Sequence, residues 1–215
     1  MERGKLITFE GGDGVGKTTQ VARLAAFLAA RGVAVVTTRE PGGTALGLEI
    51  RRLLVGDGPT APLPRAELFL YLADRAQHVD ALVRPALERG AWVVCDRFVD
   101  STIVYQGAGR GLDEGWLEAL CRAAAGGLWP DLTLWLAAPP AVTAERLARR
   151  GSHPDRFEAE GEAFQRRLFA AFARRAAAEP ERWREIDSSA PIDAVAATIA
   201  AAVVDHYPQL GEAAP

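Results

Sequence analysis

The stretch ITFEGGDGVGKTTQ, residues 7–20, decides the fold of this chain. Its apolar residues predict a strand that ends at Glu10, and the residues from Lys17 onward have apolar side chains at helical spacing. The turn between them fits the pattern G-x-x-x-x-G-K-[ST] over residues 11–18 without a mismatch. A strand before this pattern and a helix after it are typical of a phosphate-binding loop. One residue is unexpected, because Asp13 places a carboxylate inside a loop suited to anions.

The loop residues have the physical properties that phosphate binding needs. Glycines allow backbone N–H groups to point inward at an anion, and the start of the following helix adds its positive end. In loops of this pattern the lysine, here Lys17, reaches the β- and γ-phosphates, and the hydroxyl of Thr18 is a ligand of Mg²⁺. The predicted ATP-binding residues are Gly11, Gly12, Asp13, Gly14, Val15, Gly16, Lys17, Thr18 and Thr19.

Strands and helices alternate along the chain. Strands are predicted at 5–10, 33–38, 91–96, 131–137 and 182–187. Helices are predicted at 18–32, 39–55 (after a glycine turn), 64–90 (broken near Pro85), 113–126, 139–151, 162–179 and 192–207, with a loop and a short helix over 97–110. This order favours an α/β, three-layer P-loop NTPase fold, in which a five-stranded parallel sheet has helices on both faces. A single domain is expected to span residues 1–215.

The composition argues against several functional classes. The net charge of −3 provides no global basic field for nucleic acid. No apolar run approaches the roughly 20 residues of a membrane span, and no signal peptide is recognisable. Cys95 and Cys121 have no metal or redox spacing, so reduced thiols in a cytoplasmic protein are expected.

A phosphate-binding loop is compatible with three classes of protein. These are a small-molecule kinase, a GTPase switch, and an ATPase that drives a partner or a filament. A GTPase normally reads guanine with the pattern N-K-x-D, and this chain contains no Asn. The ATPase class survives this test, because VVCD (93–96) could be the apolar strand ending in Asp that such an ATPase needs.

The segment CDRFVDSTIVYQGAGRG, residues 95–111, favours the kinase. Asp96 ends a predicted strand, at the edge where loops of a parallel sheet build their site, and it can hold Mg²⁺. Arg97 follows on the same edge, and an arginine fork suits a dianionic phosphate. A metal-binding acid and a second phosphate clamp beside the loop indicate a donor and an acceptor phosphate in one cleft.

At this point the chain resembles thymidylate kinases of the bacterial type, over roughly residues 5–200. The resemblance is carried, in order and spacing, by EGGDGVGKTT, TREPGGT, LADRAQH, DRFVDSTIVYQGAGRG, PDLTLWL and DRFE. It implies an enzyme that transfers the γ-phosphate of Mg-ATP to dTMP and forms homodimers, for which the apolar helix face at 64–82 is a candidate. The alternatives are another nucleoside monophosphate kinase or an ATP-dependent switch ATPase.

The resemblance also implies roles for individual residues. Asp13 would face the 3′-hydroxyl of the acceptor sugar, Arg97 would hold the dTMP phosphate, and Arg75 would bind the thymine edge. Tyr71 replaces the usual stacking Phe, and Tyr105 would crowd the 2′ position of the sugar. The implied dTMP-binding residues are Asp13, Glu40, Arg51, Tyr71, Arg75, Arg97, Thr102, Tyr105 and Gln106.

A mobile lid is implied at about residues 149–160. Gly14 stands where another type of the family carries a catalytic arginine, so a lid residue, Arg150 or Arg156, would supply that charge. The implied catalytic residues are Lys17, Arg97, Asp96, Arg150, Arg156 and Asp13, and the metal ligands are Thr18 and Asp96. One departure is Ala137, where the family usually has Asp after the fourth strand.

Overall fold

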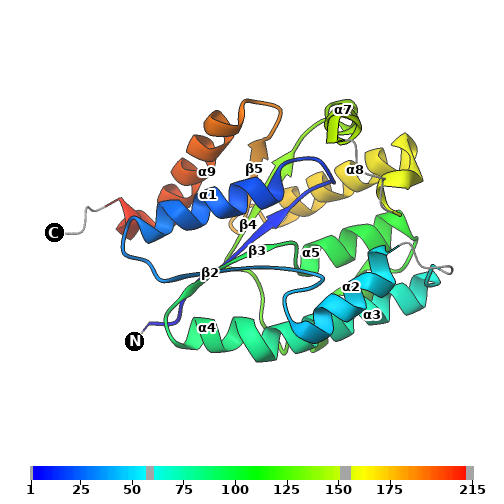
Figure 1. Cartoon of the computed structure of the whole chain (residues 1–215), viewed down its shortest axis with the longest axis horizontal. Coiled ribbons are helices and arrows are strands. Elements are labelled where there is room, and N and C mark those ends of the chain that lie inside the picture. Colours follow the sequence, from blue (N-terminus) through cyan, green and yellow to red (C-terminus); the bar gives the residue numbers. More distant parts are fainter. Residues whose placement is uncertain (1, 57–60, 151–155, 212–215) are drawn as a thin grey trace.

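The computed structural model describes residues 2–56, 61–150 and 156–211 (Figure 1). Their five strands form one parallel sheet in the order β2-β3-β1-β4-β5. The strands are β1 (Leu6–Glu10), β2 (Val35–Arg39), β3 (Trp92–Asp96), β4 (Leu132–Ala137) and β5 (Trp183–Asp187). Helices cover both faces of this sheet, so the predicted fold class is confirmed.

The helical elements were largely visible in the sequence. They are α1 (Lys17–Ala29), α2 (Ala45–Val55), α3 (Pro64–His78), η1 (Val79–Val83), α4 (Arg84–Glu88), α5 (Val99–Thr102), η2 (Ile103–Gly109), α6 (Glu114–Ala124), α7 (Pro140–Arg150), η3 (Glu158–Glu160), α8 (Glu162–Ala178), α9 (Ile192–His206) and η4 (Pro208–Leu210). None of the described helices is long and apolar enough to cross a membrane.

Two predictions about helix ends were wrong. The helix over 64–90 does not stop near Pro85, because the π-helical η1 joins α3 to α4 and Pro85 lies in the first turn of α4. The segment 97–110, predicted as a loop with a short helix, is mostly helical, because a second π-helical element, η2, continues α5. Both segments pack against neighbouring helices, and this packing outweighs the local glycine and proline signals.

Strand β1 lies at the centre of the sheet and is buried over its whole length. Its successive residues alternate between the two faces, so Ile7 joins the core beneath α1 and α9, whereas Leu6 joins the core beneath α3, α4 and α6. Phe9 is in register with Asp96 of β3. The turn after β1 and the loop after β3 therefore leave the sheet side by side, at the edge where parallel sheets bind ligands.

Candidate active site

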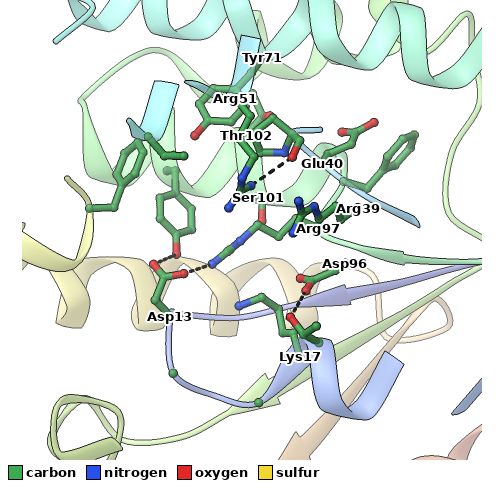
Figure 2. A pocket seen from close by; sticks show the side chains of 18 of the residues that line it. Asp13, Lys17, Arg39, Glu40, Arg51, Tyr71, Asp96, Arg97, Ser101 and Thr102 are labelled. Atoms are coloured by element: carbon green, nitrogen blue, oxygen red, sulfur yellow. Dashed lines mark hydrogen bonds and ion pairs between the residues drawn. The ribbon is translucent and has the colours of Figure 1, made fainter. Parts of the chain in front are cut away.

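A cavity of about 530 Å³ opens at this edge of the sheet (Figure 2). The turn after β1, the loops after β2 and β3, and the helices α2 and α3 provide its walls. It brings together the predicted residues Asp13, Gly14, Gly16, Lys17, Thr18, Thr19, Glu40, Arg51, Tyr71, Arg75, Asp96, Arg97, Thr102, Tyr105 and Gln106. Segments far apart in the sequence thus meet in one space large enough for a small molecule.

The glycine-rich turn needs its glycines for backbone reasons. Gly11, Gly14 and Gly16 all have positive φ angles, of 131°, 79° and 93°, which side chains with a Cβ atom rarely adopt. A Cβ atom on Gly11 would also lie 2.6 Å from the carbonyl oxygen of Leu136. No side chain caps the first turn of α1, so its N–H groups are available to an anion.

Lys17 lies against this turn rather than in solvent. Its Nζ atom donates to the carbonyl oxygens of Gly11, at 3.1 Å, and Gly12, at 2.6 Å. Burial, together with the positive charge of Arg97, lowers the pKa of Lys17 to about 8. The ammonium group is therefore held at the loop, where it lines the cavity.

Thr18 and Asp96 meet at the mouth of the cavity. The Thr18 hydroxyl donates to Oδ2 of Asp96 at 2.9 Å, which joins the start of α1 to the end of β3. A hydroxyl and a carboxylate oxygen are ligand types that Mg²⁺ accepts, so the donor set fits this metal. Within the described part of the chain, no cluster of three or more His, Cys, Asp or Glu side chains could hold a metal ion by itself. Mg²⁺ usually takes its other ligands from water and substrate phosphates.

Asp13 turns away from the floor of the loop and toward the opposite wall of the cavity (Figure 2). Its carboxylate accepts from the Arg97 guanidinium at 2.6 Å and from the Tyr105 hydroxyl at 3.3 Å. Burial acts to raise the pKa of Asp13, but the charges of Arg97 and Lys17 outweigh burial and lower it. Asp13 is therefore an anion that joins the phosphate loop to the segment after β3.

The other end of the cavity is closed by a buried network of charged and polar side chains. Glu40 accepts from Nε of Arg75 at 2.9 Å through one carboxylate oxygen, and its other oxygen lies 2.9 Å from Nδ1 of His78. Arg75 also donates to Thr102 at 2.9 Å and to the carbonyl oxygen of Phe98 at 3.0 Å. These contacts fix the guanidinium in a single orientation, with its side chain 1% exposed.

Glu67 of α3 contacts a second set of polar and charged side chains. It accepts from Gln106 at 2.7 Å and from Arg156 at 2.5 Å, and Arg110 lies 3.4 Å away. Arg156, predicted as a catalytic residue, therefore contacts Glu67 and does not line the cavity in this conformation. The side chain of Arg150 and residues 151–155 of the predicted lid lie outside the described residues.

Three residues of the predicted ATP-binding turn lie behind the cavity wall. Val15 packs into the core under α1, and Gly11 and Gly12 turn their carbonyl oxygens toward Lys17.

The prediction missed further lining residues, namely Arg39, Pro41, Val55, Phe98, Ser101, Arg146, Leu147 and Phe157. Ser101 lies in α5, and its hydroxyl accepts from Nη1 of Arg97 at 3.1 Å. Arg146 and Leu147 carry no signal, because only the packing of α7 brings them to the cavity.

Comparisons with known proteins agree with this geometry. The family model described as Thymidylate kinase matches residues 9–199. A thymidylate kinase of Chromohalobacter salexigens is 50% identical over 207 residues, which cover 96% of this chain and 98% of the relative. Those of Gloeobacter violaceus and Bifidobacterium longum are 52% and 51% identical, over 92% and 91% of this chain and 93% and 95% of theirs. This chain therefore belongs to the thymidylate kinase family.

Proposed function

We propose that this enzyme transfers the γ-phosphate of Mg-ATP directly to the phosphate of dTMP, giving dTDP and ADP. The observation that carries the proposal is the 2.6 Å contact between Asp13 and Arg97, which joins the phosphate loop to the segment after β3. A donor phosphate on the loop and an acceptor phosphate on Arg97 would then share one cavity. In-line transfer needs this shared space.

The donor half of the proposed mechanism uses the turn and the start of α1. The inward N–H groups and Lys17 would hold the β- and γ-phosphates of ATP and offset their charge. Thr18 and Asp96 would hold Mg²⁺, which supplies further positive charge to these phosphates. No covalent intermediate is required, because the acceptor phosphate is itself an anionic nucleophile.

The acceptor half uses the opposite wall. Arg97 would pair with the dTMP phosphate, and Asp13 would accept from the 3′-hydroxyl of the sugar. The Tyr105 ring lies 4.9 Å from the Arg97 guanidinium carbon, and its hydroxyl contacts Asp13, so it would crowd a 2′-hydroxyl on a sugar bound there. Tyr71 would stack on the thymine, whose edge would meet Arg75 and Thr102, with Glu40, Arg51 and Gln106 shaping the same wall.

The proposed lid, residues 149–160, would complete the site when both substrates are bound. Arg150 or Arg156 would then cover the charge that spreads over the transferring phosphoryl group. For Arg156 this requires leaving Glu67, which it contacts at 2.5 Å. Closure would also exclude water, which would otherwise accept the phosphoryl group and hydrolyse ATP.

The test of this function is ADP release from Mg-ATP with single nucleoside monophosphates. We expect strong stimulation by dTMP, weaker stimulation by dUMP, and little by dCMP, AMP, CMP or GMP. Stimulation by a different monophosphate would keep the phosphate chemistry and remove the thymine contacts. Steady hydrolysis without stimulation by any of them would point instead to the switch ATPase.

We also propose that the protein is a cytoplasmic homodimer. The support is an exposed apolar face on α2, α3 and α6, elements that pack side by side. Its largest members are Leu46, Leu53, Phe69 and Trp116, and the last two rings meet edge-on at 6.5 Å. Sedimentation equilibrium should give twice the chain mass, and a monomer at all concentrations would contradict the proposal.

A further inference from the structure

Glu10 is a buried carboxylate that has no role in the mechanism given above. It ends β1, its residue is 0% exposed, and it does not line the cavity. One of its oxygens accepts from the backbone N–H of Phe98 at 2.9 Å. The other accepts from the Ser101 hydroxyl at 2.5 Å. Both partners belong to the segment that follows Arg97, so the end of β1 is tied to that segment at two points.

Ser101 extends this tie to the guanidinium of Arg97. Its hydroxyl gives its one proton to Glu10 and accepts from Nη1 of Arg97 at 3.1 Å. The same Nη1 atom donates to the carbonyl oxygen of Gly11, the residue after Glu10, at 2.9 Å. The Arg97 head group is therefore held from two consecutive residues of the chain, through Ser101 in one case and directly in the other.

The backbone of Arg97 also needs this support. Its φ angle is 67°, the only positive value at a non-glycine residue in the described part of the chain. Such a conformation costs on the order of 1 kcal/mol or more and persists where the surroundings enforce it. The bond from the Phe98 N–H to Glu10 fixes the peptide that follows directly. Glu10 thus constrains both the backbone and the side chain of Arg97.

Only a carboxylate satisfies both contacts at this position. An amide of the same shape could accept from Phe98 with its oxygen, but its nitrogen would then donate to Ser101. The Ser101 proton would then lose its acceptor, and the amide N–H would compete with Arg97 as a donor to the Ser101 oxygen. A buried carboxylate is costly to keep in the core, and these two acceptor positions give a physical reason for it.

We propose that Glu10 is a positioning residue for the acceptor phosphate, because it fixes the Arg97 guanidinium through Ser101 and the Phe98 amide. This inference rests on the proposed function, in which Arg97 binds the phosphate of dTMP. Glu10 acts on the phosphate only through Arg97 and has no contact with the base or the sugar. Its loss should therefore weaken the binding of dTMP, through the phosphate, and leave the binding of thymidine and of Mg-ATP nearly unchanged.

Calorimetric titration of Glu10→Gln with dTMP and with thymidine tests this point. We expect the Kd for dTMP to rise about tenfold or more, the cost of a misplaced charge-assisted contact, while the Kd for thymidine stays within about twofold. The KM for Mg-ATP should also stay within about twofold. Equal losses for dTMP and thymidine, or an unchanged Kd for dTMP, would overturn the role of Glu10.

Two further variants keep the test decisive. Thr8→Val is the control, because Thr8 lies in β1 like Glu10 and loses only its buried hydrogen bond of 3.0 Å to Thr133. This variant should lower stability without changing the ratio of the Kd for dTMP to the Kd for thymidine. Ser101→Ala keeps the bond from Phe98 to Glu10 and should reproduce the selective loss of dTMP, so it replaces Glu10→Gln if that variant does not fold. If Glu10→Gln lost affinity for dTMP but Ser101→Ala bound dTMP like the wild type, the proposed link from Glu10 through Ser101 to Arg97 would be overturned.

Wild-type titrations separate this inference from the proposed function. If the wild-type protein binds dTMP no more tightly than thymidine, Arg97 does not hold the phosphate, and the proposed function and the role of Glu10 both fail. If the wild type prefers dTMP and Glu10→Gln retains that preference, only the role of Glu10 fails.

Discussion

The two halves of the cavity are built in different ways. The proposed donor half comes mainly from one continuous stretch, residues 11–18, which offers backbone N–H groups and one lysine, and Asp96 joins it from the end of β3. The acceptor half draws side chains from loops and helices up to about 100 residues apart, and its central groups, Glu40, Arg75 and Thr102, are at most 4% exposed. The proposed donor half is made mainly by backbone conformation, whereas the proposed acceptor half is made by buried side chains.

This difference predicts different consequences of substitution. A change to the Lys17 side chain should remove chemistry and leave the fold largely intact, because its ammonium contacts the turn itself and not the hydrophobic core. A change deep in the proposed acceptor half should disturb the fold together with binding, because the side chains proposed to bind dTMP are also buried in the core. The following variants test that contrast, from the largest expected effect to the smallest.

Lys17→Ala should lower kcat by at least about 1,000-fold, because it removes the one side-chain cation of the phosphate turn. The binding of dTMP, measured by calorimetry, should change little, since its proposed contacts lie on the other wall. Turnover close to that of the wild type would contradict the donor role of this turn.

Arg75→Ala should lower the free energy of unfolding by about 3 to 5 kcal/mol, because it leaves the buried carboxylate of Glu40 without its guanidinium. Urea unfolding measures the effect. Arg122→Ala is the matched control, since its ion pair with Glu118 is exposed and should contribute less than about 1 kcal/mol. Equal effects of the two variants would show that the acceptor network is not part of the core.

Arg97→Ala should reduce kcat/KM for dTMP by about 100-fold or more, the loss of two charge-assisted contacts to a phosphate. The KM for Mg-ATP should stay within about twofold, since the donor contacts remain. Steady-state kinetics with each substrate varied in turn makes the comparison. Equal losses for both substrates would remove the acceptor role of Arg97.

Glu10→Gln should change how stability depends on pH. Burial, with the nearby charge of Asp100, raises the pKa of Glu10 to about 7, although Ser101, Arg97 and the Phe98 amide favour its charged form. A raised carboxyl pKa stabilises the fold below the ordinary value of 4.5, and that contribution is lost as the pH rises through 7.

Between pH 5 and pH 8 the wild type should therefore lose about 2 kcal/mol of unfolding free energy relative to Glu10→Gln. Urea unfolding of both proteins at both pH values gives this difference, in which the other titrating groups largely cancel. A constant difference between the two proteins would show that Glu10 titrates at its ordinary pKa.

Tyr71→Phe should give the smallest effect, within about twofold of the wild-type Kd for dTMP, because the ring that would stack on thymine is kept. The companion variant Tyr71→Ala should raise the Kd for dTMP about tenfold, since the ring is lost. If Tyr71→Phe bound dTMP as weakly as Tyr71→Ala does, the contact with dTMP would be made by the hydroxyl and not by the ring.

The contrast between the two halves also explains what could be predicted from the sequence. The phosphate turn was visible because its residues are contiguous and its glycines have backbone reasons to be there. Asp96 and Arg97 were visible because they follow a buried strand, and the ends of parallel strands share an edge. All five strands begin and end within two residues of their predicted bounds.

The errors have a common physical cause, which is packing between distant segments. The prediction of a loop with a short helix over 97–110 underestimated the helical part of this segment. Gly107 and Gly109 let η2 pack closely against α6 and α8, and a Cβ atom on Gly109 would lie 2.9 Å from the Phe164 ring. The pairing of Arg156 with Glu67 joins residues 89 positions apart, and local sequence does not encode it. The ties from Glu10 to Phe98 and Ser101 were missed for the same reason.

The network of Glu40, Arg75 and Thr102 has a consequence for redesign of the enzyme toward other acceptor bases. A library that varies Arg75 alone would leave the buried carboxylate of Glu40 without its guanidinium in nearly every member, so selection would recover the original residue for reasons of folding. Varying the three positions together, with His78 as their neighbour, lets replacements pair with one another. A new specificity is therefore reached by coordinated exchange and not by successive single steps.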